Sequence, residues 1–114
     1  MIHIGERLKT VASMVPLCQT MADIGTDHGY VPAYLALSGQ CRHVIASDIA
    51  EGPCRAAAET RDRYSLFGQM EIRTAPGLKG LRAGEAEAVV IAGMGGATIV
   101  SILEEDPEIA ATEI

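Results

Sequence analysis

The chain has 114 residues, of which 48% are hydrophobic and only 4% aromatic, and its formal net charge is −6. This length accommodates one small domain, whose core must consist of aliphatic side chains because Trp is absent. No apolar run approaches the ~20 residues of a membrane span, and no basic-then-apolar leader opens the chain. We therefore expect a cytoplasmic protein without a membrane segment.

Acidic residues gather toward the C-terminal end. Residues 83–114 carry seven acids and no Lys or Arg, whereas residues 1–82 carry eight acids and nine bases. An acidic surface repels a phosphate backbone. The sequence therefore shows no dedicated nucleic-acid surface, and a nucleic-acid substrate would need binding charge from elsewhere.

Helical and strand-like segments alternate along the chain. Residues 6–15 place apolar side chains at helical spacing, Gly39 is expected to end the second helix, and Gly68 the third. The expected helices are 6–15, 30–38, 51–67 and 97–105, and the expected strands are 20–24, 43–48, 70–74 and 88–92. This alternation predicts an α/β fold with a parallel sheet and right-handed crossovers.

The last expected strand, AVVIA at 88–92, is entirely apolar and is typical of a central strand buried on both faces. Only one helix follows it, although doubly wound sheets carry roughly five to seven strands. We interpret the chain as the first half of a longer protein, with this strand at an exposed edge. Such an edge is open to self-association.

The most informative segment is residues 21–35, MADIGTDHGYVPAYL, where an apolar strand runs into glycines and then a helix. Asp23, Gly25, Asp27 and Gly29 alternate there. A strand, a glycine turn and a helix N-terminus form the ligand-binding corner of nucleotide-binding α/β folds. The next strand ends at Asp48, 25 residues after Asp23, where such folds place a ribose-binding acid. The pattern predicts an adenosine-containing cofactor.

Asp27 distinguishes between cofactors. It stands where dinucleotide-binding loops carry a glycine, and a carboxylate at a helix N-terminus disfavours a pyrophosphate but favours a cation. S-adenosyl-L-methionine carries a sulfonium and an ammonium and no phosphate, so the loop favours this methyl donor over NAD. One alternative is a nucleotide-dependent oxidoreductase, and the other is an incomplete cofactor-binding fragment without activity.

Each polar residue of the site also has a structural interpretation. Asp23 is a buried organiser of its loop or a ligand contact, and Asp27 caps the following helix, contacts the ligand, or does both. Asp48 is a ribose ligand or the N-cap of the helix that starts at Glu51. His28 is either structural or a cofactor contact.

Two later loops complete the expected site. Gly77 lies in a turn beside the expected adenine position, although glycine there is also ordinary turn chemistry. Gly93, Met94 and Gly95 follow the fourth strand, where bare backbone and a polarisable side chain face both cofactor and substrate. We predict that these three residues line the catalytic cleft; the alternative is a plain strand–helix turn.

The cysteines Cys18, Cys41 and Cys54 are odd in number and lack metal-type spacing. We interpret them as reduced thiols packed as small hydrophobes. The three histidines are scattered, so we expect no metal site.

Four segments together resemble the bacterial TrmK family, S-adenosyl-L-methionine-dependent tRNA methyltransferases that modify N1 of adenine 22. They are RLKTVASMVP, ADIGTDHGYVP, AEGPCRAA after Asp48, and IAGMGGATIVSIL. The resemblance runs from about Glu6 to Leu103 and implies a Rossmann-like class I methyltransferase fold, truncated after the fourth strand and its helix. The implied roles are the methionine-side loop for Gly25, Asp27, His28 and Gly29, the ribose for Asp48, and the cleft for Gly93 and Met94.

Two departures from the family qualify these implications. Family members are about twice as long, with further strands and a C-terminal helical domain that helps to hold tRNA. We therefore expect residues 1–114 to be the N-terminal portion of the cofactor-binding domain, inactive alone, with tRNA bound mainly through the absent part. Where the family reads GNGL, this chain has the sequence APGL at 75–78, without the polar side chain near adenine.

The implied reaction does not require a general base. The lone pair of adenine N1 carries no proton, so catalysis depends on holding N1 in line with the methyl group. Since N1 takes part in base pairing, the base must first be splayed out of the tRNA.

Overall fold

The computed structural model describes residues 3–91 and 96–105, and within them every expected helix and strand is present. The elements in chain order are α1 (Glu6–Ser13), β1 (Cys18–Ile24), α2 (Tyr30–Leu37), β2 (Cys41–Asp48), α3 (Glu51–Arg63), β3 (Met70–Thr74), the 3₁₀ turn η1 (Gly77–Gly80), β4 (Ala88–Ile91) and α4 (Gly96–Glu105).

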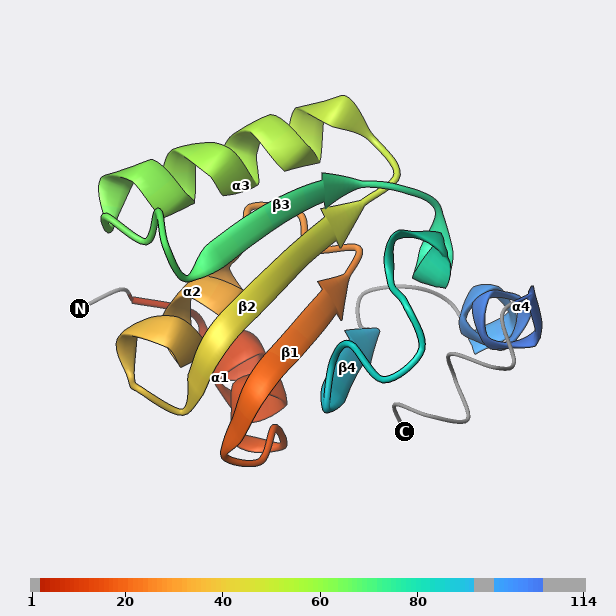
Figure 1. The fold of residues 1–114 in the computed structure, drawn as a ribbon, viewed down its shortest axis with the longest axis horizontal. Coiled ribbons are helices and arrows are strands. Elements are labelled where there is room, and N and C mark those ends of the chain that lie inside the picture. Colours follow the sequence, from red (N-terminus) through yellow and green to blue (C-terminus); the bar gives the residue numbers. More distant parts are fainter. Residues whose placement is uncertain (1–2, 92–95, 106–114) are drawn as a thin grey trace.

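The described strands form one parallel sheet in the order β3-β2-β1-β4. Helical crossovers connect β1 to β2 and β2 to β3, which confirms the expected α/β architecture. The strands end at a common edge of the sheet (Figure 1). Asp23 and Asp48, near the ends of β1 and β2, are therefore brought to that edge.

Each face of the sheet has its own apolar cluster. On one face, Met21, Val44 and Met70 pack with residues of α1, α2 and α3. On the other, Ile45 packs with Leu78 of η1 and with residues of α4. Figure 1 shows α4 beside η1, away from the first three helices. No helix within the described ranges has the length and apolar character needed to cross a membrane.

Helix α3 ends earlier than the sequence suggests. It stops at Arg63, because Ser65 adopts a left-handed φ of 56° and the Leu66 N–H turns back to the Arg61 carbonyl at 2.9 Å. Leu66 is buried under this turn, as in the common Schellman ending. The expected extension to Gly68 was wrong, whereas α2 ends before a left-handed glycine as expected.

Strand β4 lies at an edge of the described sheet. It pairs with β1 from Met21↔Ala88 to Ile24↔Ile91, and its four residues are all half-buried. The edge position is confirmed, while the burial on both faces expected of a central strand is not found in the described sheet.

Candidate functional site

The turn after β1 is fastened to the end of β2 by backbone hydrogen bonds. The N–H groups of Gly25 and Thr26 both donate to the Ser47 carbonyl, at 2.9 and 3.0 Å. Gly25 and Asp27 have left-handed φ angles of 75° and 58°, a region that glycine and aspartate enter more readily than most residues. The loop is thereby held at the carboxyl edge of the sheet.

Asp23 is buried inside this turn, with 6% of its surface exposed. The Thr26 hydroxyl donates to Asp23 Oδ2 at 2.9 Å. Burial raises the pKa of Asp23 to about 7, in spite of the opposing effect of the Thr26 hydrogen bond. Asp23 therefore organises its loop, as one interpretation expected, and its carboxyl group stays partly protonated at neutral pH. A cation beside it would favour its ionisation.

Asp48 joins two loops at the end of β2. Its Oδ2 accepts the N–H of Asp27 at 3.3 Å, and its Oδ1 accepts the N–H of Ala50 at 3.1 Å. The N-cap of α3 is Ala50, so the interpretation of Asp48 as that N-cap was wrong. Since a carboxylate offers about four acceptor positions, both oxygens retain capacity for ligand hydroxyls.

Asp27 and His28 lie at the mouth of the site. Asp27 Oδ1 is 3.2 Å from His28 Nδ1, and more than half of each side chain is exposed. The His28 ring stacks on Tyr30, with centroids 5.2 Å apart. The N-cap of α2 is Gly29, without a side-chain cap, so Asp27 does not cap that helix. Both side chains line a cavity instead.

Gly29 has a packing role that the sequence did not reveal. It is buried with a φ of 72°, and an added Cβ would lie 2.7 Å from Met70 Cε and 3.0 Å from Ala57 Cβ. The close approach of the loop to α3 and β3 therefore requires glycine here. This packing accounts for the glycine, and its expected contact with a cofactor stays a prediction.

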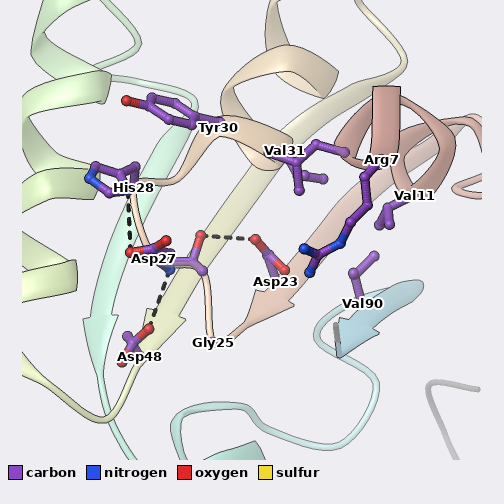
Figure 2. Close-up of a pocket in the computed structure, with 12 residues that line it drawn as sticks. Arg7, Val11, Asp23, Gly25, Asp27, His28, Tyr30, Val31, Asp48 and Val90 are labelled. Carbon is purple, nitrogen blue, oxygen red and sulfur yellow. Dashed lines mark hydrogen bonds and ion pairs between the residues drawn. The ribbon is translucent and has the colours of Figure 1, made fainter. Parts of the chain in front are cut away.

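One cavity of about 410 Å³ opens beside the loop, on the side of α1 and α2 (Figure 2). Asp23, Asp27 and Asp48 supply three carboxyl groups to its lining. Arg7 lines it too and extends from α1 toward Asp23 (Figure 2). The remaining lining comprises Leu8, Val11, Gly25, Thr26, His28, Tyr30, Val31 and Val90. Three carboxyl groups disfavour a pyrophosphate and favour a ligand that carries positive charge.

A second cavity, of about 480 Å³, lies between the ends of β1 and β2 and the η1 and α4 segments. Gly25 and Asp48 line both cavities. Gly77 lines the second one, with a φ of 51°, and an added Cβ there would lie 3.2 Å from Ile102 Cγ2. Its other lining residues are Ile24, Ile49, Ala75, Pro76, Ala97, Thr98, Ser101 and Ile102. The two cavities together form a bipartite site, with Asp48 lining both parts.

The structure thus brings together Asp23, Gly25, Asp27, His28 and Asp48, with Gly77 across the second cavity. Gly93, Met94 and Gly95, expected to line the catalytic cleft, lie outside the described residues.

Sequence reasoning did not assign to the site five residues with polar groups that line the cavities: Arg7, Thr26, Tyr30, Thr98 and Ser101. Arg7 and Thr26 lie within the quoted RLKTVASMVP and ADIGTDHGYVP segments, so the resemblance contained the information needed to examine them. Thr98 and Ser101 likewise lie within the quoted IAGMGGATIVSIL segment, but their place beside the site follows from the packing of α4.

Comparison with known proteins decides the family. Residues 4–113 match the sequence pattern of a methyltransferase domain family. The chain belongs to this methyltransferase domain family. This methyltransferase domain is 41% identical over 103 residues to the tRNA (adenine(22)-N(1))-methyltransferase of Bacillus subtilis, covering 90% of the chain and 43% of that relative.

Solved structures agree. The domain matches B. subtilis TrmK, an M1A22 tRNA methyltransferase, with a TM-score of 0.91 and 38% identity, covering 96% of this chain and 47% of that one. Streptococcus pneumoniae Sp1610 in complex with S-adenosyl-L-methionine gives a TM-score of 0.92, 35% identity and coverages of 96% and 52%. M. capricolum TrmK in complex with S-adenosyl-homocysteine gives a TM-score of 0.84 and 33% identity, covering 90% of this chain and 47% of that one.

The resemblance to TrmK is confirmed: the methyltransferase domain matches the N-terminal part of TrmK, and its fold is Rossmann-like. The chain spans about half the length of the relatives that it matches.

Proposed function

We propose that this chain is the cofactor-binding portion of an S-adenosyl-L-methionine-dependent methyltransferase that acts on N1 of adenine 22 in tRNA. The observation that carries the proposal is Asp48, placed between two cavities at the carboxyl edge of a methyltransferase-family sheet. A nucleoside with a charged tail on one side and a base on the other fits this bipartite shape. The names of the relatives supply the reaction and the substrate.

The first cavity suits the methionine part of the cofactor. Asp23 and Asp27 offer carboxyl groups to the ammonium and sulfonium charges, and Arg7 offers a cation to the carboxylate (Figure 2). A phosphate group would meet the same acids as repulsive neighbours. This distribution of charge favours the methyl donor over a nicotinamide dinucleotide.

The second cavity suits adenine. Asp48 accepts hydrogen bonds from the two ribose hydroxyls, and Ile49, which is 71% exposed, covers one face of the ring. Since Pro76 has no N–H, we propose that the hydroxyl groups of Thr98 and Ser101 supply polar contacts to the base. Gly77 completes the wall opposite Asp48.

A bound S-adenosyl-L-methionine would supply the electrophilic methyl group, and the chain's own residues would position the cofactor and the substrate base. Because the lone pair of adenine N1 carries no proton, none of the carboxyl groups would need to act as a base. The rate then depends on alignment, and extrusion of the base costs a few kcal/mol.

Substrate binding belongs mainly to the longer protein. Residues 1–82 carry nine bases against eight acids, so they offer little net positive charge to a phosphate backbone, and the relatives are about twice as long as the matched region. We propose that residues 1–114 form the N-terminal portion of the cofactor-binding domain, that tRNA is held chiefly by segments beyond it, and that the protein works in the cytoplasm.

The edge of β4 provides a further part of the proposal. Its outer backbone groups have no neighbouring strand within the described sheet, so the isolated chain self-associates through this edge. Size-exclusion chromatography over a wide concentration range tests this; elution as a monomer at high concentration would contradict it.

The cofactor assignment is tested by calorimetric titration with S-adenosylhomocysteine and, separately, with NADH. We expect micromolar binding of the first and none of the second. Preferential binding of NADH by a folded sample would favour the oxidoreductase alternative.

Because Arg7 lines the cavity, Arg7→Gln should weaken binding of S-adenosylhomocysteine, whereas Lys9→Gln, on the same helix but outside the cavity lining, should not.

A further inference from the structure

Two cysteines face each other at the amino edge of the sheet, opposite the cofactor cavities. Cys18 opens β1 and Cys41 opens β2, and the two residues are direct partners in the parallel register. Their Sγ atoms are 3.3 Å apart. All three cysteines of the chain are free thiols in this structure.

The backbone geometry is compatible with a covalent bond between them. Neighbouring strands lie about 4.8 Å apart, and disulfides join residues whose Cα atoms are roughly 4.4–6.8 Å apart. Directly paired residues also project their side chains from the same face of a sheet. Closing the sulfur contact to a bond therefore needs adjustment of side chains without separation of the strands.

The surroundings make the two thiols unequal. Cys18 is half-buried and lines an open recess of about 400 Å³, together with Arg42 and Glu87. Cys41 is fully buried, and burial, with the hydrogen bond to Cys18, raises its pKa to about 12. A small disulfide thus reaches the Cys18 sulfur first, and the Arg42 side chain offers a cation to an anionic reagent such as glutathione.

We propose that Cys18 and Cys41 form a redox-active dithiol that small disulfides, with oxidised glutathione as the probe, convert into an intramolecular disulfide. The Cys18 thiolate attacks one sulfur of oxidised glutathione; its S–S bond breaks, and one glutathione leaves and takes up a proton. Cys41 then loses its proton and attacks the Cys18 sulfur of the mixed disulfide, which releases the second glutathione. The two protein thiols are oxidised, and one glutathione disulfide is reduced to two thiols.

Cys54 serves as the internal control. It is buried on α3, with its Sγ 3.6 Å from the Asp48 carbonyl oxygen and 3.5 Å from that of Arg73, at the opposite edge of the sheet. It has no cysteine partner among the described residues, so it should stay reduced throughout.

The test treats the folded 114-residue chain with oxidised glutathione, quenches with acid, and then counts thiols and measures intact mass after denaturation. We expect two of three thiols to disappear with a mass loss of two hydrogen atoms, and peptide mapping to link residue 18 to residue 41. Cys54→Ala should lose both of its remaining thiols with the same mass change. Three persistent thiols, or a glutathione adduct that remains on Cys18 in the unmodified sequence, would overturn the proposal.

Single substitutions test the order of attack. Cys41→Ser should accumulate a glutathione adduct at Cys18, because nothing resolves the mixed disulfide, whereas Cys18→Ser should leave Cys41 unmodified. The reverse pattern would refute the assigned order. Mapping of the unmodified sequence needs no variant, so the proposal is tested even if a substitution prevents folding. The outcome is also independent of the proposed cofactor, since no step requires its binding.

Discussion

The buried carboxyl group of Asp23 should make the stability of this domain fall as pH rises. An aspartate in an unfolded chain has a pKa of about 3.9, whereas burial raises the pKa of Asp23 to about 7. Between these values the folded state holds a proton that the unfolded state has released, so the free energy of unfolding decreases with pH and levels off above pH 7. Below pH 4 both states are protonated and the cost vanishes.

Asp23→Asn removes this titration while keeping an oxygen to accept the Thr26 hydrogen bond. At 1.36 kcal/mol per pKa unit, the raised pKa of Asp23 lowers the free energy of unfolding by about 1–2 kcal/mol at pH 5 and by about 4 kcal/mol at pH 8. The stability advantage of the variant should therefore grow by about 2–3 kcal/mol between these two pH values. Urea unfolding of both proteins measures it.

The same urea experiment on Glu59→Gln provides the control, because Glu59 is exposed on α3. Its effect should stay within a few tenths of a kcal/mol at both pH values. A difference between wild type and Asp23→Asn that is the same at pH 5 and pH 8 would refute the assignment of a raised pKa to Asp23.

Three further predictions follow from the same contacts. Gly29→Ala should cost about 2–4 kcal/mol, combining left-handed strain with overpacking, whereas Gly39→Ala, with a φ of 79° and open space around it, should show only the strain of about 1–2 kcal/mol. Glu85→Gln should cost about 1.5–3 kcal/mol, because Arg73 donates to both carboxylate oxygens at 2.8 and 2.6 Å. Affinity for S-adenosylhomocysteine should fall about tenfold from pH 8 to pH 6, because Asp23 must ionise beside the ammonium.

A specific experimental result would contradict each of these three predictions. Equal losses for Gly29→Ala and Gly39→Ala in thermal or urea unfolding would remove the packing argument for Gly29. The contact with Arg73 lowers the pKa of Glu85 to about 2. The stability that the ionised Glu85 side chain contributes is therefore fully present above about pH 4.3 and is lost as the pH falls toward 2. If Glu85→Gln lowers the free energy of unfolding as much at pH 2 as at neutral pH, the stabilising ion pair between Arg73 and Glu85 is contradicted. A calorimetric affinity that does not vary with pH, or that varies equally in Asp23→Asn, would exclude Asp23 from the binding equilibrium.

Local patterns predicted the elements well where both ends carry strong signals. Met70–Thr74 was predicted without error because turn residues bound it on both sides. Strands β1 and β2 each begin two residues earlier than expected, because Cys18 and Cys41 pair with each other across the sheet. That pairing depends on a partner 23 residues away, and no window of local sequence contains it.

Some residues of the candidate site could likewise be predicted from local sequence, whereas others could not. Topology alone brings the strand-end acids Asp23 and Asp48 to one edge, so sequence order was enough to predict their proximity. Arg7 and Ser101 enter the site from helices at opposite ends of the chain. Their contribution follows from the packing of α1 and α4, and helical periodicity alone does not distinguish them from other polar residues of those helices.

The central claim is that Asp48 holds the ribose of an adenosyl cofactor, and one calorimetric titration with S-adenosylhomocysteine tests it most directly. Asp48→Asn keeps the shape of the side chain but removes its charge, whereas Glu51→Gln makes the same change on an exposed acid outside both cavities. Loss of a hydrogen bond to a charged group, worth about 1.5–3 kcal/mol, predicts roughly tenfold to 100-fold weaker binding for Asp48→Asn and unchanged binding for Glu51→Gln. Equal affinity in the unmodified chain and in folded Asp48→Asn would contradict the account.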